Sequence, residues 1–531
     1  MKRIRCWLLA AACLALLGCG AGDGVDNGSV LHRGLATDPE SLDPQLARSM
    51  QAANVLRDIG EGLLSYTPDG QLVPGSAESW QISADGLVYT FNIRAAARWS
   101  DGNPVTAENF VIGLRRLVDP AIAAFYASTV IDIVNAAAII AGEAPAETLG
   151  VAALDTRTLQ LSLSRPVPYF LRLLTHPSTF PARPTPANAE SDKRRRSLLS
   201  NGAYRLMSWE PGSLLRLRRN EYYWNDAATA VDAVHHHVIT EETAELNRYR
   251  AGELHTTGNV PPENFAAVRK RYGDELRVTQ YLGIDYLGFN LSRPPFKDKP
   301  ELRQALSMAI DREILVEKIT GRGEAPAYSW VPPGTSNYEP PHLSYADLSQ
   351  DERNIIAQSL YEQAGFSADN PAVIELRYNT SATQQRVALA VQAMWSDVLG
   401  VDVTLINEEF QVLLSNIREA KITEVFRGSW IGDYDDATTF LKLLTGDNPS
   451  NVSGYKSETF DSLMQRAASQ ADAGRRRLFL EEAERVLLVD HPVIPLYFYV
   501  SKHLVRPEVK GWEDNVLDYH YSQHLSLDAA R

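Results

Sequence analysis

The sequence predicts an α/β protein of two or three domains that contains a parallel β-sheet. Strand-like and helix-like segments alternate between residues 371 and 432. Earlier in the chain, Tyr89, Phe91 and Ile93 share one face of a segment whose other face is less apolar, which is typical of a half-buried strand. The chain has 531 residues, of which 44% are hydrophobic, and this is enough material for several cores.

The N-terminus has the pattern of an export signal. A basic start precedes an apolar run at residues 7–17. This run is shorter than the roughly 20 apolar residues that a permanent membrane helix needs. Residues 16–19, LLGC, resemble the lipobox of bacterial lipoproteins, which implies that Cys19 becomes the acylated first residue of the mature chain. The Gly-rich, polar residues 20–29 suit a flexible tether.

Charge and cysteine content exclude several classes of partner. The formal net charge of −14 repels phosphate backbones, so we expect no nucleic-acid partner. The three cysteines, Cys6, Cys13 and Cys19, all lie near the N-terminus. The folded body is therefore expected to have no disulfide and no Cys-rich metal site.

The first part of the chain predicts a succession of strands and helices. Strand-sized apolar runs begin at Val30, and a helix is predicted over residues 50–64. Asp85-Gly86 then precedes the strand at residues 88–93. A Gly- and Pro-containing loop follows, after which Thr106 caps a helix whose apolar face consists of Phe110, Val111, Leu114 and Leu117.

The segment between residues 371 and 432 predicts a strand-helix-strand-helix-strand unit. Its expected strands and helices are at residues 374–378, 384–399, 401–405, 413–417 and 422–428. Strands joined through helices in this way run parallel to one another.

The carboxyl ends of such strands form a predicted binding site. Ligands of parallel sheets bind at that edge. Here the edge brings together residues 379–384, residues 407–410 and the stretch RGSWIGDYDDATTF at residues 427–440. The sequence therefore predicts a site at Trp430 and Asp433, and it predicts that Asp435 and Asp436 cap the helix that follows.

No catalytic motif accompanies this site. The HExxH, GxSxG and Walker patterns are absent from the sequence, so an enzyme is not predicted. In the run His235-His236-His237, the first and third imidazoles share a strand face. Two imidazoles are too few for a closed zinc site, so no metal or cofactor is predicted.

Several longer motifs resemble one family. RWSDGNPVTAENF, preceded by YTFNIR, is similar to the signature of the family 5 extracytoplasmic solute-binding proteins, the peptide, dipeptide and nickel receptors of ABC importers. The oligopeptide-binding branch is indicated by NGAYRLMSWEPGS, NEYYWN, NRYRAGEL and RPPFKDKPELRQALSMAIDRE, which follow in order. The resemblance spans essentially the whole mature chain.

The resemblance implies a periplasmic-binding-protein-like, two-lobe (Venus flytrap) α/β fold of class II, cluster C, with an extra inserted domain. It divides the chain into a signal peptide, a tether, a first lobe made of three segments, an inserted domain and a second lobe. The corresponding residues are 1–18; 19–29; 30–60, 185–282 and 501–531; 61–184; and 283–500. Two crossing strands would form the hinge.

The resemblance also implies how the two ends of a peptide are held. Asp433 would bind the α-amino group, and Arg427 and Lys318 would neutralise the carboxylate. Lys318 lies late in a helix that the sequence predicts at residues 312–319. Gln384 stands where the best-studied branch has a His, and it cannot carry a positive charge. How the carboxylate is fully met, and the preferred peptide length, therefore remain open.

Other positions match pocket or strand-pairing positions of the family. The expected pocket side chains are Tyr126, Tyr286, Phe410, Trp430 and Tyr499, and the segments expected to flank the peptide are Arg48 to Met50 and Ser429 to Ile431. The disulfide common in the family would join the positions of Gly283 and Ile431, and both cysteines are absent here. The strand crossing at this point must then depend on packing.

Together these patterns predict a monomeric, lipid-anchored receptor in the periplasm or cell envelope, which binds oligopeptides and delivers them to the permease of an ABC importer. One alternative is a receptor for a specialised peptide, such as a murein fragment or a signalling peptide. A second alternative, from another class, is an extracytoplasmic peptidase.

Overall fold

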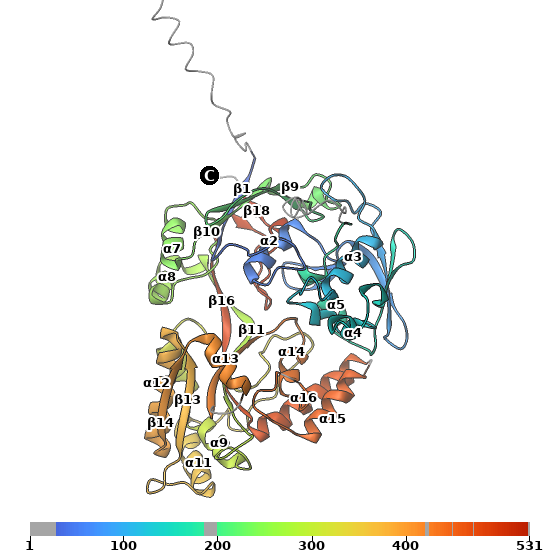
Figure 1. The fold of residues 1–531 in the computed structure, drawn as a ribbon. Helices are drawn as coiled ribbons and strands as arrows, with labels where there is room; N and C mark the ends of the chain where they lie inside the picture. The colour runs from blue at the N-terminus through green and yellow to red at the C-terminus, as the bar shows by residue number, and fades with distance from the viewer. Residues whose placement is uncertain (1–27, 185–198, 420–423, 449, 471, 529–531) are drawn as a thin grey trace, which may run out of the picture.

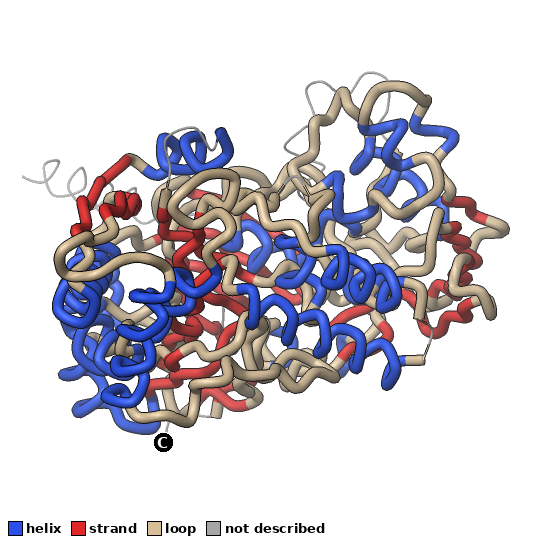
Figure 2. Tube along the Cα trace, turned by 90° about the horizontal axis from the view of Figure 1, so that it is seen from below, coloured by secondary structure: helices blue, strands red, loops and turns tan. Residues whose placement is uncertain are grey.

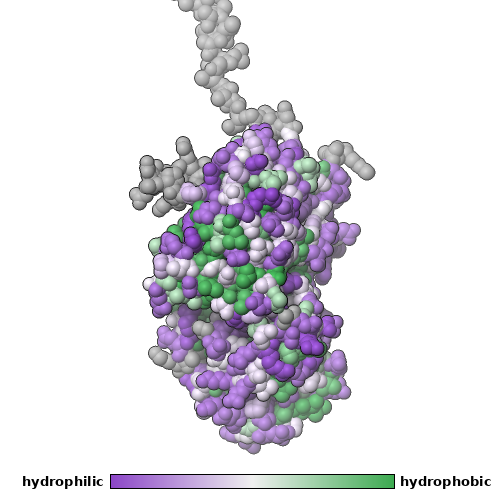
Figure 3. Space-filling view, turned by 90° about the vertical axis from the view of Figure 1, so that its right-hand side faces the viewer, coloured by the Kyte–Doolittle hydropathy of each residue, from purple (hydrophilic) through white to green (hydrophobic). Residues whose placement is uncertain are grey.

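The computed structural model describes residues 28–184, 199–419, 424–448, 450–470 and 472–528. The chain forms two bodies, one above the other in Figure 1, which we call the upper and the lower lobe. Strands β11 (Leu276–Phe289) and β16 (Val493–Leu504) run from one lobe to the other. Figure 3 shows a waist between the lobes, with hydrophobic residues gathered just above it. Cys19 and most of the predicted tether lie outside the described residues.

The lower lobe contains a six-stranded sheet in the order β12-β16-β11-β15-β13-β14. In this sheet β13 (Val373–Asn379) runs parallel to β14 (Asp402–Glu408) and to β15 (Val425–Ile431). Helices α12 (Ala382–Leu399) and α13 (Phe410–Glu419) connect these strands, and Figure 2 shows helices outside the strands. The predicted parallel unit is confirmed.

The other elements of the lower lobe surround this sheet. They are α9 (Pro300–Met308), α10 (Arg312–Ile314), a π-helical stretch (Leu315–Thr320), β12 (Ala325–Pro326), α11 (Gln350–Gln363), α14 (Thr438–Leu441), α15 (Glu458–Ala468) and α16 (Ala473–Asp490). Their apolar side chains form one large core with the strands, in which Trp330 and Trp395 are fully buried.

The upper lobe contains a four-stranded sheet in the order β1-β10-β9-β8. Its first two strands, β1 and β10, are parallel, and the other pairs are antiparallel. Helix α2 packs its buried residues Val55 and Leu56 into the core of this sheet. The bounds of these elements and of the remaining ones in this part are β1 (Val30–Leu35), α2 (Met50–Ile59), β8 (Tyr204–Glu210), β9 (Leu214–Arg219), β10 (Ala233–Val238), α7 (Glu242–Arg250), α8 (Phe265–Tyr272), β17 (Val509–Lys510) and β18 (Ser526–Leu527).

A second sheet and core in the upper lobe are formed by residues 63–174. The sheet order is β4-β5-β7-β6, and helix α3 covers it. The predicted strand β5 (Val88–Ile93) buries Tyr89, Phe91 and Ile93, as expected from their alternation. The other bounds are β2 (Leu64–Tyr66), β3 (Leu72–Pro74), β4 (Ala77–Ile82), α3 (Ala107–Val118), α4 (Ala136–Ile140), β6 (Val151–Ala153), β7 (Thr158–Ser162) and α5 (Phe170–Leu173).

Short 3₁₀ helices connect several of these elements. They lie at Ala127–Val130, Ala146–Thr148, Pro177–Thr179, Asp226–Ala228, Pro262–Asn264, Gly273–Glu275, Lys442–Leu444 and Ser522–His524.

The crossing strands β11 and β16 are paired on both sides of the waist. Their register is interrupted between Gln280 and Ile284. Next to this irregularity, Gly283 lies directly opposite Ile431 across β11 and β15. A Cβ atom added to Gly283 would lie 2.6 Å from Cδ2 of Tyr499. The ring of Tyr499 therefore occupies the space that any side chain at residue 283 would need, and it packs against the backbone of this crossing.

Two expected helices differ from the structure. The helix predicted at residues 50–64 ends at Ile59, and residues 64–66 form strand β2. Gly60 is extended, with φ −132° and ψ 160°, and a Cβ there would lie 2.7 Å from the ring of Phe180, so the chain turns where this ring packs. The helix predicted at residues 312–319 has α geometry for only three residues and then widens into the π-helical stretch.

Candidate functional site

A cavity of about 540 Å³ lies where the two lobes meet. Its walls come from the start of α2, from the part of the upper lobe around residues 125–132 and 165–176, and from the end of β15. The structure thereby brings together five of the predicted site residues, Met50, Tyr126, Trp430, Ile431 and Asp433.

Asp433 stands just beyond the end of β15 in this cavity. Its backbone N–H donates to Thr439 Oγ1 at 3.1 Å, which fixes the loop. Among the described residues, no hydrogen bond or ion pair reaches its carboxylate. The carboxylate is open to solvent at the cavity mouth, yet protein atoms surround it on most sides, and this burial raises the pKa of Asp433 to about 6. Such a group is complemented by a cation.

Aromatic side chains line the same cavity from both lobes. Tyr126 donates its hydroxyl to the carbonyl of Arg48 at 3.2 Å, and its ring centroid lies 4.3 Å from that of His176. Tyr169 of the upper lobe stacks on Tyr434 of the lower lobe, with centroids 4.6 Å apart and an interplanar angle of 4°. The lobes therefore already touch at one side of the cavity.

Strand β15 borders the cavity with one open edge. On one side, residues 429–431 pair with residues 283–285 of β11. On the other side, the pairing with β13 stops at Phe426. Among the described residues, the edge of residues 427–431 that faces away from β11 has no strand partner. An extended peptide can add to such an edge through backbone hydrogen bonds.

The other predicted flanking segment has a different conformation. Ser49 is the extended N-cap of α2 and accepts a hydrogen bond from Ala52 N–H, so Met50 already belongs to a helix. Arg48 is exposed, and its backbone N–H donates to Glu40. Only Ser429 to Ile431 therefore offers a strand to a ligand in this structure.

A second, smaller cavity of about 230 Å³ lies alongside β15. Tyr286, Phe410, Arg427 and Ser429 line it, and Trp430 contributes to both cavities. Its other walls are mostly aliphatic and aromatic, from α13 and the segments around residues 443 and 452. It can hold an apolar side chain beside a cation.

Arg427 is already paired inside the protein. Its Nη2 lies 2.5 Å from Asp285 Oδ2, and it also contacts the Tyr499 hydroxyl at 2.7 Å. Although burial by itself lowers the pKa of Arg427, the nearby Asp285 carboxylate raises it, so the side chain stays charged. Tyr499, predicted as a pocket residue, instead donates its hydroxyl to Asp285 at 2.8 Å and lines neither cavity.

Gln384 belongs to the same buried cluster. Its Nε2 donates to Asp285 Oδ2 at 3.1 Å, and the side chain lines neither cavity. Asp285 Oδ1 and Gln384 Oε1 are both buried without a hydrogen-bond partner among the described residues. The cluster therefore has two acceptor atoms that no described residue meets.

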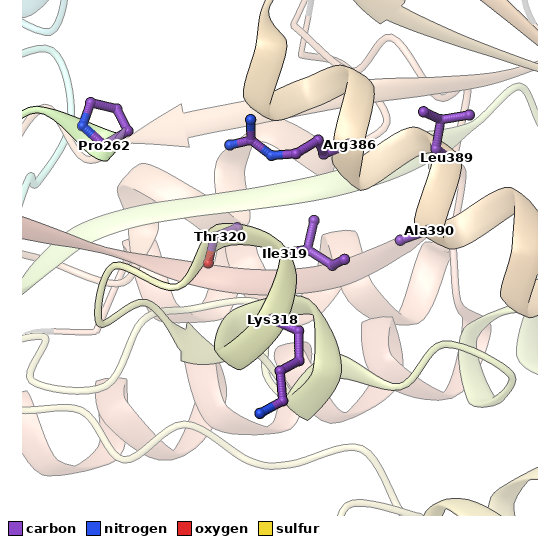
Figure 4. Close-up of a pocket in the computed structure, with 7 residues that line it drawn as sticks. All are labelled: Pro262, Lys318, Ile319, Thr320, Arg386, Leu389 and Ala390. Atoms are coloured by element: carbon purple, nitrogen blue, oxygen red, sulfur yellow. The ribbon is translucent and has the colours of Figure 1, made fainter. Parts of the chain in front are cut away.

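Lys318 is separate from these cavities. It lines a third cavity of about 510 Å³ together with Arg386 and Leu389, and its side chain is 72% exposed. Figure 4 shows its Nζ pointing away from those two residues. It forms a loose ion pair with Glu317, at 4.0 Å. The structure thus does not bring Lys318 next to Asp433 or Arg427.

The two aspartates after Asp433 have different partners. Asp436 precedes Ala437, the N-cap of α14, and accepts from Thr438 N–H at 3.1 Å; it also pairs with Arg476 at 2.7 Å. Asp435 does not cap this helix. It accepts from Ser336 N–H at 2.7 Å, so it ties a distant loop to the site and the prediction for it was wrong.

Sequence reasoning missed Asp285, the centre of the buried cluster. Its signal was present, because a lone acid interrupts the apolar run of residues 282–289. A charge at such a position needs a buried partner. The partner, Arg427, follows 142 residues later, and a single sequence does not reveal this pairing.

The chain is similar to known proteins of one family. The pattern of the bacterial extracellular solute-binding proteins, family 5, matches residues 71–451. The periplasmic oligopeptide-binding protein OppA of Salmonella typhimurium is 38% identical over 98% of this chain and 96% of its own length. Among solved structures, the unliganded open form of the murein tripeptide-binding protein MppA has a TM-score of 0.86 at 35% identity, covering 94% of this chain and 98% of that one. Haemophilus influenzae OppA in complex with the peptide RPPGFSPFR has a TM-score of 0.75 at 33% identity, covering 94% and 99%.

None of the helices in the described part of the chain is long and apolar enough to cross a membrane.

Proposed function

We propose that this chain, which belongs to family 5 of the bacterial extracellular solute-binding proteins, is a receptor that encloses a peptide between its lobes. The observation that carries the proposal is the position of the Asp433 carboxylate. It forms no ion pair or hydrogen bond with a described residue, and it lies in the interlobe cavity just beyond the open edge of strand β15. The α-amino group of a peptide is a cation that fits this acceptor.

The peptide backbone adds to the open edge of β15. Residues 429–431 offer N–H and C=O groups to it, so affinity comes largely from the main chain and tolerates many sequences. Side chains enter the two cavities, and Trp430 separates them. Ordered water fills the space that small side chains leave.

The carboxylate end of the peptide is held by a cation that already has a partner in the protein. Arg427 carries a buried cation at the second cavity, but Asp285 already pairs with it. A ligand carboxylate therefore either shares the Arg427 guanidinium with Asp285 or pairs with Lys318 after the lobes close. Gln384 helps to orient Asp285 through its hydrogen bond and contributes no charge.

Closure occurs about β11 and β16. The register irregularity between Gln280 and Ile284 lies at the waist, where a hinge is needed. The higher TM-score with an open, unliganded relative than with a peptide complex supports an open state for this structure.

The cellular role that we propose follows from peptide binding between the lobes. The receptor delivers its peptide to the permease of an ABC importer and is tethered to a membrane in the periplasm or cell envelope through acylated Cys19. It acts as a monomer and does not hydrolyse its ligand. We propose the domain division stated from the sequence, because separate cores form around residues 63–174 and around the β13–β15 sheet.

The test is retention of intact peptide. Purified protein is freed of ligand, incubated with a defined peptide mixture, separated by gel filtration and analysed by mass spectrometry. We expect one intact peptide per chain, and N-acetylated versions should be excluded. Time-dependent cleavage would instead identify a peptidase, and no retention of either form would overturn the receptor proposal.

A murein peptide is the second candidate. The murein tripeptide-binding relative gives the TM-score of 0.86, and the neutral Gln384 leaves the carboxylate end unlike that of an ordinary peptide receptor. Competition between a murein tripeptide and an unmodified tripeptide in the same assay decides between the two.

A further inference from the structure

Three histidines share one face of the upper-lobe sheet, away from the peptide cavities. His235 and His237 alternate on β10, so both point to the same side. The parallel register of β1 and β10 places His32 opposite His235. One ring nitrogen of each imidazole lies within 4.8 Å of one from each of the other two. Figure 1 shows β1 and β10 at the far end of the upper lobe, and none of the three lines a cavity of the site above.

The sequence contained only part of this cluster. Two alternating imidazoles on β10 are too few for zinc, and this is why no metal is expected from the sequence. The third comes from a strand about 200 residues earlier, and only the pairing of β1 with β10 adds it. Two ligands at alternate positions of a strand, with a third on the neighbouring strand, form the three-protein-ligand set that leaves a zinc ion one open position.

The proton arrangement in the cluster can be deduced from its hydrogen bonds. Arg248 Nη2 lies 3.0 Å from His237 Nδ1, and because a guanidinium only donates, Nδ1 is an acceptor. His237 Nε2 then carries the proton and donates it to His32 Nδ1, 2.9 Å away. His255 Nδ1 accepts from the backbone N–H of His32 at 2.9 Å and holds this strand position in place.

The spacing suits a small tetrahedral ion. Zinc–nitrogen distances of about 2.0–2.1 Å separate two ligand nitrogens by roughly 3.3 Å. The distance of 2.9 Å between His32 Nδ1 and His237 Nε2 must increase slightly to reach this value. The other nitrogen–nitrogen distances, which are at most 4.8 Å, shorten when the imidazole rings rotate. The proton on His237 Nε2 moves to Nδ1, so Arg248 must leave. Its side chain is 34% exposed and is already held by Glu253 at 2.7 Å, which gives it another place to stay.

We propose that His32, His235 and His237 form a binding site for a divalent transition-metal ion of the zinc, nickel and copper group, with its fourth position open to water. Soft and borderline ions of this group favour imidazole, whereas magnesium and calcium favour oxygen. The bound ion joins the N-terminal strand β1 to β10, just after the tether.

A second cluster, His503, Asp518 and His520, does not carry the same proposal. His503 is engaged at both ring nitrogens, by the Thr257 carbonyl at 2.9 Å and by Asp518 at 2.8 Å. Asp518 also contacts His520 at 3.1 Å. This arrangement satisfies its own members.

The test is a metal titration of the full-length chain without a histidine tag, after removal of metal by a chelator. Calorimetry with Zn²⁺ should show one site per chain, and Co²⁺ should give the visible absorption of a tetrahedral complex. Loss of an outer-shell partner typically weakens metal binding about 10–100-fold, so His235→Gln and His237→Gln should each weaken it by about 100-fold or more. Arg248→Gln should tighten it, because a competing donor and a positive charge are removed.

The matched control is His342→Gln, which removes an exposed loop imidazole elsewhere. It should leave the zinc affinity unchanged, and all variants should keep the circular dichroism and peptide affinity of the wild type. The proposal is overturned if the wild type binds no more zinc than the variant lacking all three imidazoles, or if His342→Gln weakens binding as much as His235→Gln. Peptide binding is measured separately, so failure of the metal site leaves the receptor proposal intact.

Discussion

Arg427 Nη2 lies 2.5 Å from Asp285 Oδ2, and its Nε lies 3.1 Å from the same oxygen. The two side chains are 11% and 0% exposed. The cation that we propose for the ligand carboxylate is thus already paired within the fold before any ligand binds.

Arg427→Ala should therefore destabilise the ligand-free protein. Removing one partner of a buried pair leaves the other charge uncompensated, which costs about 3–5 kcal/mol. Lys318→Ala is the control, because its exposed side chain should change the free energy of unfolding by less than about 0.5 kcal/mol. Urea unfolding monitored by fluorescence measures both. Equal urea midpoints for Arg427→Ala and wild type would show that the pair contributes nothing to stability.

Asp433→Ala should weaken peptide binding by about 2–5 kcal/mol, because the peptide ammonium loses its charged acceptor. Asp132→Ala is a matched control in the same cavity, since Arg165 already pairs with Asp132 at 2.7 Å. It should cost much less. Calorimetry with one peptide and its N-acetylated form checks this: blocking the amine should weaken binding to wild type but not to Asp433→Ala. Unchanged affinity of that variant would place the amino end elsewhere.

Peptide affinity should have an acid limb near pH 6. The raised pKa of Asp433 means that the free receptor holds a proton there below about pH 6, whereas the complex requires the carboxylate. Affinity therefore increases with pH up to about 6, and it decreases again above roughly pH 8, where the peptide amine loses its proton. His176 lines the same cavity, but burial lowers its pKa to about 3, so it stays neutral across this range.

A series of calorimetric titrations between pH 4.5 and 9 measures this profile. In Asp433→Asn the acid limb should be absent while the folded state persists. An acid limb that survives in this variant would assign the proton to another group.

Gly283→Ala should destabilise the protein through a clash with Tyr499. The added methyl would meet Cδ2 at 2.6 Å, and overpacking of this kind typically costs about 1–3 kcal/mol. The cost should disappear in a Tyr499→Ala background and persist in Tyr499→Phe, which keeps the ring and removes only the hydroxyl. Unfolding free energies of this double-mutant cycle decide the matter. A cost that is the same in all three backgrounds would contradict the packing explanation.

Cys19→Ser should release the protein from the membrane without changing peptide affinity. The proposed lipid anchor requires the Cys19 thiol of the lipobox-like LLGC, and the cavity is lined by other parts of the chain. Cell fractionation and the mass of the N-terminal peptide measure the two states. Cys13→Ser, within the signal, is the control and should stay membrane-bound. Membrane retention of Cys19→Ser would remove the lipid-anchor proposal.

The sequence by itself determined the elements whose signal is local. The alternation at Tyr89, Phe91 and Ile93 gave strand β5, and the period of the apolar positions gave α3. The chain from residue 373 to residue 431 gave three parallel strands, because helical connections impose that direction. Asp433 could be singled out since it follows the last of these strands.

Only the tertiary structure decided which distant residues meet. Asp285 pairs with Arg427 142 residues away, and His32 joins His237 from 205 residues away, because strand register and not sequence spacing sets these contacts. The end of α2 at Ile59 likewise depends on the ring of Phe180 packing against Gly60. The periodicity of apolar residues indicates which side of a helix or strand is buried. The pairing between strands determines which residues that side contacts. For this reason the pairing of Arg427 with Asp285 and the histidine cluster emerged only from the fold.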